Sequence, residues 1–206
     1  GRLETPSEKE WLGELATETK GRFSFDQEDM SFPPSAEKNK TIRYTIEKTH
    51  DFAWFADKRY LVMEDSVKLP NSGRTVTTRA FFTNDQAELW RDATRYINDA
   101  LTHYSGWYGD YAWDNCTAIL GARGSRGNGM EYPTITAIGH TNQPKMLEVV
   151  IMHEVGHNWF YGMLGFNERR YPYLDEGINT FSEIRYIQDK YKNENQLYKM
   201  FSMDRD

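Results

Sequence analysis

The feature that most constrains this chain is the pentad His-Glu-Val-Gly-His at residues 153–157. The run around it, from Met146 to Phe160, is apolar nearly all round, and Pro144 precedes it at a position that suits the first turn of a helix. Such a helix is expected to be buried. Two histidines and a glutamate on a buried helix need partners, because unpaired polar groups are costly in an apolar interior. The alternative, a helix with two surface histidines, is therefore disfavoured.

The spacing within the pentad points to a metal. Residues i and i+4 of a helix lie one above the other on the same face. His153 and His157 can therefore direct two imidazole nitrogens at one zinc ion, which accepts such nitrogens at about 2.0–2.1 Å. Glu154 is rotated from His153 by about 100° around the helix. It stands beside the metal, where it can take a proton from a zinc-bound water, and it is the expected general base.

The third ligand has to come from another part of the chain. In the metzincin pattern a glycine and a histidine follow the pentad, but Phe160 and Met163 occupy those positions, so that class is excluded. The other option is a glutamate on the next helix, and Glu176 follows His157 after the 18 residues at positions 158–175. Two glycines and a proline between them break the chain and allow it to turn back: Gly162, Gly165 and Pro172.

The helix that begins near Glu176 offers further polar side chains to the same site. Positions 176, 180 and 183 share one face of a helix, so Thr180 and Glu183 are expected to reach the site as outer partners of the ligands. An outer carboxylate that fixes a ligand histidine is the usual arrangement around zinc. The alternative for Glu183 is a plain surface glutamate, and the sequence leaves both open.

The rest of the chain predicts strands before helices. Alternating apolar residues and turn signals predict strands at 41–46, 60–68, 75–82, 117–121 and 132–138. Helical periodicity predicts a short helix or turn at 7–20 and helices at 85–104, 145–163 and 174–191, the first of these three capped by Asn84. Strands followed by helices are typical of an α+β unit.

Composition excludes several classes of function. The net charge of −6 and the pI of about 5.5 argue against nucleic acid and against an anionic membrane surface. The Gly-rich stretch 122–129 contains two arginines and could bind RNA, but a surface hairpin loop is the preferred interpretation. No apolar run is long enough to span a bilayer. The single cysteine, Cys116, can form neither an internal disulfide nor a cysteine zinc site.

The zinc motif resembles that of the gluzincin aminopeptidases, the family of aminopeptidase N and leukotriene hydrolase, which place a glutamate 18 residues after the pentad. Three further segments, at 51–55, 106–111 and 129–133, are similar to segments of this family. The resemblance implies a thermolysin-like catalytic unit with one zinc ion per chain. It assigns residues 1–60 to the end of an N-terminal β domain with its lead-in, and residues 61–206 to the first part of the catalytic domain.

The third of these segments, Gly-Met-Glu-Tyr-Pro at 129–133, carries a further implication. In the family its glutamate binds the free α-amino group of the substrate, a role that falls here on Glu131. The backbone of Gly129 and Met130 would line the cleft and pair with the peptide like an added edge strand. Tyr132 stands where the family usually has asparagine. Without the resemblance, Glu131 would be interpreted as a charged residue at the end of a strand.

The resemblance also implies that the chain is part of a larger protein. It begins abruptly at Gly1 and stops at Asp206 without a closing element, and the family's transition-state tyrosine would lie beyond that residue. We therefore expect the isolated chain to bind zinc with little or no activity. The expected partners are a peptide with a free N-terminus and the remaining domains of the parent protein. Exported bacterial members of the family are consistent with a location in the periplasm or cell envelope.

The zinc motif predicts a zinc peptidase with Glu154 as base, and the resemblance implies an aminopeptidase with Glu131 as the amine anchor. A thermolysin-like endopeptidase has the same zinc site but needs no carboxylate at the position of Glu131. A scaffold without catalytic function is a second alternative, against which the intact His153, Glu154, His157 and Glu176 argue. A different hydrolysis at the same site, such as epoxide opening, is a third.

Overall fold

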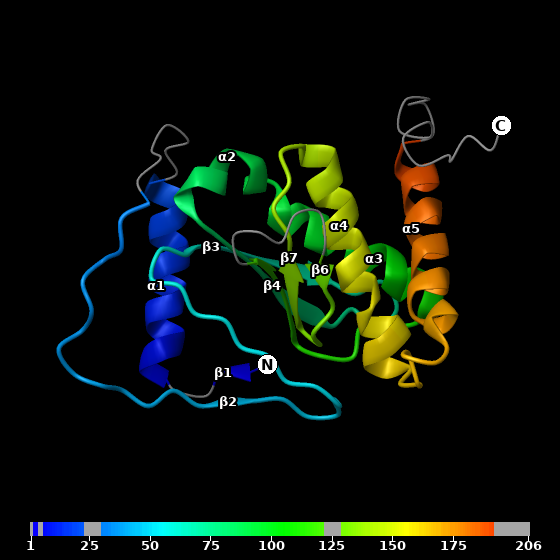
Figure 1. Ribbon diagram of the computed structural model, residues 1–206, viewed down its shortest axis with the longest axis horizontal. Coiled ribbons are helices and arrows are strands. Elements are labelled where there is room, and N and C mark those ends of the chain that lie inside the picture. Colours follow the sequence, from blue (N-terminus) through cyan, green and yellow to red (C-terminus); the bar gives the residue numbers. More distant parts are fainter. Residues whose placement is uncertain (1, 4–5, 23–29, 122–128, 192–206) are drawn as a thin grey trace.

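A five-stranded mixed sheet forms the centre of the molecule (Figure 1). The structure is a computed structural model that describes residues 2–3, 6–22, 30–121 and 129–191. The strands follow the order β3-β4-β5-β7-β6, with bounds Leu61–Lys68, Thr75–Phe82, Asn115–Leu120, Ile135–Ile138 and Gly129–Met130. The inner strands β4, β5 and β7 run parallel, whereas β3 and β6 pair antiparallel with their neighbours. A mixed sheet covered by helices confirms the predicted α+β class.

Helices α3 (Ala93–Tyr108), α4 (Pro144–Gly156) and α5 (Glu176–Lys190) pack together beside this sheet, and the last two bring the candidate site together (Figure 1). Helices α3 and α4 pack against the sheet and against each other, and α5 packs on α4. The core between them consists of large apolar side chains with almost no exposure, among them Trp90, Ile97, Leu101, Leu147 and Ile151. Helix α4 therefore lies buried, as its apolar composition predicts.

A buried polar cluster fixes the far end of α5 on α4. Glu148 of α4 is 3 % exposed and accepts hydrogen bonds from the Tyr186 and Tyr191 hydroxyls and from the Lys190 ammonium group. The lysine also contacts Asp99 of α3. These contacts compensate for burying the carboxylate, and they hold α5 in one orientation along α4.

The opposite ends of the three helices meet at Gly156. A Cβ atom on this residue would lie 2.2 Å from both Asn179 Oδ1 and the Tyr104 hydroxyl, so only glycine permits this close approach. The Tyr104 hydroxyl donates to Asn179 Oδ1 at 2.7 Å. Asn179 Nδ2 in turn donates to the carbonyl of His153 at 2.7 Å, which ties α5 to the pentad.

The predicted helix at 85–104 is wrong in its boundaries. The structure contains a 3-10 turn at Asn84–Gln86, helix α2 at Ala87–Trp90 and then α3, with a break at residues 91–92. Asn84 is not a cap residue, because it is the first residue of the 3-10 turn, Thr83 precedes that turn, and Gln86 precedes α2. The backbone at Asp92 has ψ near 7° instead of the helical value of about −42°, so the helical path is interrupted there.

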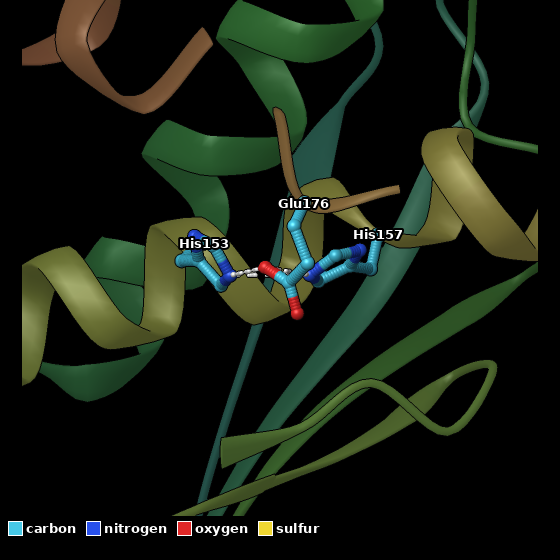
Figure 2. A group of neighbouring side chains, drawn as sticks. All are labelled: His153, His157 and Glu176. Atoms are coloured by element: carbon cyan, nitrogen blue, oxygen red, sulfur yellow. Dashed lines mark hydrogen bonds and ion pairs between the residues drawn. The ribbon is translucent and has the colours of Figure 1, made fainter. Parts of the chain in front are cut away.

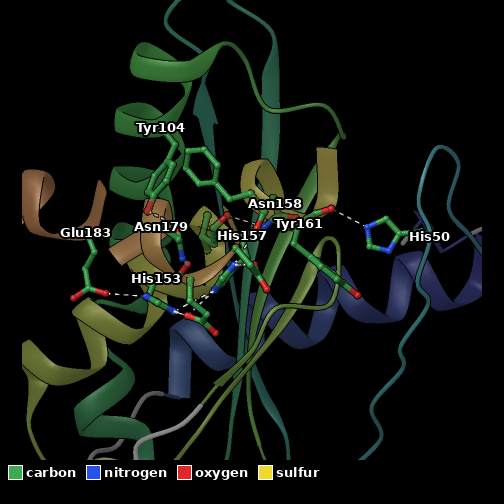
Figure 3. Close-up of polar contacts among 12 residues, drawn as sticks. His50, Tyr104, His153, His157, Asn158, Tyr161, Asn179 and Glu183 are labelled. Atoms are coloured by element: carbon green, nitrogen blue, oxygen red, sulfur yellow. Dashed lines mark hydrogen bonds and ion pairs between the residues drawn. The ribbon is translucent and has the colours of Figure 1, made fainter. Parts of the chain in front are cut away.

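The predicted helix at 145–163 also ends early, because α4 stops at Gly156. A π-helical turn follows at Asn158–Met163, and inside it Phe160 and Tyr161 leave helical geometry. Tyr161 has φ 138°, which is strained for a non-glycine residue. His50 Nε2 contacts the Tyr161 carbonyl at 2.8 Å, and the Tyr161 hydroxyl donates to Asp51 at 3.0 Å, so two residues that are distant in the sequence hold Tyr161 in place (Figure 3).

The other predicted elements are found with shifted ends. The helix predicted at 7–20 is α1 (Pro6–Arg22), which packs on β3. The strand predicted at 41–46 is reduced to β2 (Tyr44–Thr45), paired with β1 (Arg2–Leu3). A 3-10 turn, Pro172–Leu174, precedes α5. No helix of the described residues is long and apolar enough to cross a membrane. Most of the Gly-rich stretch, residues 122–128, lies outside the described residues.

Candidate metal centre

The last turn of α4, the residue that follows it and the first residue of α5 bring three possible metal ligands together (Figure 2). His153 Nε2 and His157 Nε2 lie 3.1 Å apart. Glu176 Oε2 lies 3.1 Å from His153 Nε2 and 3.7 Å from His157 Nε2. The turn back through residues 158–175, which the sequence suggested, is therefore what places Glu176 opposite the two rings.

These separations fit the donor set of one zinc ion. Donor atoms at about 2.0–2.1 Å from a tetrahedral zinc lie about 3.3 Å from one another. The three observed distances, 3.1, 3.1 and 3.7 Å, surround that value. The residues present thus fit zinc in donor type and in spacing.

The other ring nitrogen of each histidine has a partner. His153 Nδ1 lies 2.9 Å from Glu183 Oε2 (Figure 3). His157 Nδ1 lies 3.1 Å from the carbonyl of Phe160 and 2.6 Å from Asp175 Oδ1. Such partners favour the tautomer with the proton on Nδ1, which leaves Nε2 with a lone pair for the metal. Burial acts to lower the pKa of His157, but the contacts with Asp175 and Glu176 outweigh it and raise this pKa to about 10, so a metal has to displace the second proton from this ring.

Two residues at this site are not predicted from the sequence. Asp175 is 5 % exposed beside His157, and Asn179 is fully buried below His153. Each directly precedes a residue that was expected at the site, Glu176 and Thr180. Asp175 and Asn179 are themselves four residues apart, and this i, i+4 spacing is the signal that could have identified them. Glu183 is 8 % exposed and faces His153. Thr180 is exposed, and within the described part of the chain no hydrogen bond joins it to either histidine.

Glu154 follows His153 on α4 and lies next to strand β6. Its side chain is buried at 5 % exposure, and Oε2 has no hydrogen-bond partner among the described residues. Burial raises the pKa of Glu154 to about 7. A carboxylate with a pKa near neutrality can both take and return a proton at physiological pH, which suits a general base.

Strand β6 brings the segment 129–131 to the same place. Gly129 lies so close to Glu154 that a Cβ atom would be 2.1 Å from Oε1. Glu131 is half-buried, and its carboxylate forms a group with Glu154 and His157 whose atoms lie within 4.8 Å of one another. Burial raises the pKa of Glu131 as well. Within the described residues Gly129 and Met130 form the edge strand of the sheet, antiparallel to β7.

Asp175 provides a test of how the outer contacts support the ligands. Asp175→Asn is expected to weaken zinc binding by about 10–100-fold, the usual cost of losing an outer partner of a ligand histidine. The measurement is the zinc dissociation constant, by competition with a chelator of known affinity. Thr180→Ala is the matched control on the same helix, and its affinity should stay unchanged. Equal affinity of Asp175→Asn and the unchanged protein would contradict a supporting role for this carboxylate.

Comparisons with known proteins find relatives in structure only. Neither a protein-family model nor a curated protein matches the sequence. The M1 zinc metallopeptidase from Deinococcus radiodurans is 19 % identical with a TM-score of 0.51, over 71 % of this chain and 33 % of that one. Legionella pneumophila aminopeptidase A in complex with aspartic acid is 13 % identical with a TM-score of 0.56, over 64 % and 17 %.

This likeness establishes the fold of the chain. Its mixed sheet and helices match part of the M1 zinc metallopeptidases in architecture. The chain spans about a third or less of the length of these neighbours.

Proposed function

We propose that this chain is the zinc-binding part of an aminopeptidase, which hydrolyses the first peptide bond of a peptide with a free N-terminus. The observation that carries the proposal is the position of Glu131, whose carboxylate shares one cluster with Glu154 and His157. An ammonium group needs a carboxylate partner. A carboxylate fixed this close to the metal ligands would leave room for a single residue before the bond that is cut.

His153, His157 and Glu176 would hold one zinc ion, which when bound supplies a Lewis acid that polarises water and the scissile carbonyl. Glu154 takes the proton of the attacking water and passes it to the leaving amine. Its buried position, with an unpaired Oε2 among the described residues and a pKa of about 7, supports this role. Glu131 binds the α-amino group and so fixes the substrate against the base.

Strand β6, at the edge of the sheet, can bind the peptide backbone. Gly129 and Met130 pair with β7 on one side only within the described residues, so their outer edge can accept a peptide backbone in extended form. Gly129 adds no side chain between that peptide and Glu154. The substrate would then lie between the edge strand and the ligand histidines, with its N-terminus at Glu131.

The test compares one short peptide with its N-acetylated form. Because the chain spans only a third of its structural neighbours, the assay uses the full-length protein. We expect release of the first residue from the free peptide only. Glu131→Gln should lower kcat/KM for the free peptide by about 10–100-fold, as expected for the loss of a charge-assisted hydrogen bond.

Two other outcomes would change the assignment. Internal cleavage of both peptides at similar rates would overturn the amine anchor and favour a thermolysin-like endopeptidase. Zinc binding without cleavage of either peptide would favour a scaffold. Gln143→Glu adds a carboxylate just before α4 and serves as a surface-charge control, which should leave the preference for a free N-terminus unchanged.

A further inference from the structure

A buried asparagine connects the end of α4 with the turn that directly follows Glu131. Asn158 directly follows the ligand His157 and is 1 % exposed (Figure 3). Its Oδ1 accepts a hydrogen bond from the Thr134 amide at 3.0 Å, and its Nδ2 donates to the Val155 carbonyl at 2.9 Å. The side chain therefore spans from the metal-binding helix to the segment behind strand β6.

The segment that it reaches is a strained turn. The Ile135 amide donates to the Tyr132 carbonyl at 3.1 Å, which closes a four-residue turn with Pro133 and Thr134 at its centre. Proline suits the first central position, but the second has φ 67° and is occupied by a β-branched threonine, where glycine or asparagine is the usual residue. Such a conformation persists only when the surroundings hold it.

Thr134 is held on both sides of its backbone. Its carbonyl accepts a hydrogen bond from the Thr117 amide of β5 at 2.9 Å, and its amide donates to Asn158. Both residues are almost fully buried, so no solvent can replace either bond. One bond fixes the turn to the sheet, and the other fixes it to the metal-binding helix.

We propose that Asn158 is a positioning residue for substrate recognition. By holding the turn at Thr134, it sets the distance between the Glu131 carboxylate and His157, and with it the place of the substrate's amino group relative to the metal. This inference rests on the proposed aminopeptidase function. Asn158 touches no substrate itself, and it acts through the turn that begins directly after Glu131.

The experiment uses the full-length, zinc-loaded protein and the variant Asn158→Ala. The KM for the free peptide should rise by about tenfold, since the buried Thr134 amide loses its acceptor and the turn relaxes. The preference for the free over the acetylated peptide should fall by the same factor, while the zinc content stays at one per chain. A purely structural role would lower the amount of folded protein without changing this preference.

Two further variants separate positioning from general damage. In the Asn158→Ala background, Thr134→Gly removes the backbone strain at this position, because glycine adopts φ 67° freely. The turn should then keep its conformation without Asn158, and most of the preference for the free peptide should return. Tyr111→Phe is the matched control. It removes a buried hydroxyl that donates to the Asn115 carbonyl at 3.0 Å and, in a longer bond of 3.5 Å, to Asn158 Oδ1, but it leaves the bond from the Thr134 amide to Asn158 intact. Its KM should be unchanged.

The possible failures are distinguishable. If the unchanged protein does not prefer the free peptide, the proposed function fails and the inference falls with it. If it does, but Asn158→Ala keeps the full preference or loses its zinc, only the inference is overturned. Should Asn158→Ala not fold, Asn158→Asp keeps the acceptor for Thr134, and loss of the preference in that variant would equally overturn the positioning role.

Discussion

Glu154→Gln is expected to reduce peptide hydrolysis by about 10²–10⁴-fold, the usual contribution of a general base. Glutamine keeps the size of the side chain but cannot accept the proton of the attacking water at neutral pH. Glu154 is not among the three side chains whose donor atoms match a zinc site, so the variant should keep its zinc. The measurement is kcat on the free peptide together with zinc content of the purified full-length protein.

The control for this variant is Glu88→Gln, which changes a carboxylate on the surface, where the Glu88 side chain is 61 % exposed. It should leave both kcat and zinc content unchanged. Hydrolysis that survives in Glu154→Gln would assign the base to another residue. Loss of zinc in the same variant would instead make Glu154 a ligand, in the second group that it forms with Glu131 and His157.

Gly129→Ala is expected to lower kcat by about 100-fold, because displacement of a reacting group by about 1 Å costs that much. The added Cβ would lie 2.1 Å from Glu154 Oε1 and 2.2 Å from its carboxyl carbon, so either the base or the edge strand has to move. Zinc affinity should change little, since His153, His157 and Glu176 are not displaced. The measurement is again kcat, with zinc affinity determined in parallel.

Gly165→Ala is the matched control for this substitution. A Cβ at Gly165 would meet its nearest neighbour, His50, at 3.7 Å, which is ordinary van der Waals contact. This variant should retain the full kcat. Equal activity of Gly129→Ala and Gly165→Ala would show that the contact between the edge strand and Glu154 has no role in the reaction.

Local patterns were enough to predict most of the framework. The strands at 61–68 and 75–82 follow from alternating apolar residues around a turn, and both were predicted to within one residue. Helix α4 follows from its apolar run and from Pro144, which the structure places at its first residue. Such features depend on neighbours within a few positions, which a sequence displays directly.

Other features depend on contacts between distant segments and could not be predicted in this way. The end of α4 is one of them, because the strained backbone of Tyr161 is held by His50 and Asp51, about 110 positions earlier. The turn at Thr134 is another, since the Asn158 side chain holds a conformation that threonine does not favour locally. Neither partner can be recognised from the spacing of apolar residues.

The face that α5 presents to the site is the clearest example of a feature that could not be predicted from local sequence. Helical spacing from Glu176 suggested Thr180, which is exposed, whereas Asn179 is buried against Tyr104 and the carbonyl of His153. The rotation of a helix about its own axis is set by what it packs against. Here that is the close approach at Gly156 and the polar cluster around Glu148.

The sequence by itself determined which chemical groups the candidate site has. The pentad at 153–157 and the later Glu176 supply two imidazoles and two carboxylates, and a spacing of four residues puts the imidazoles on one helix face in any structure where that helix forms. Only the tertiary structure decided how these groups face one another and which residues support them. Asp175, Asn158 and Gly129 lie close to residues of other elements, and such short distances arise only when the helices and the sheet pack into one core.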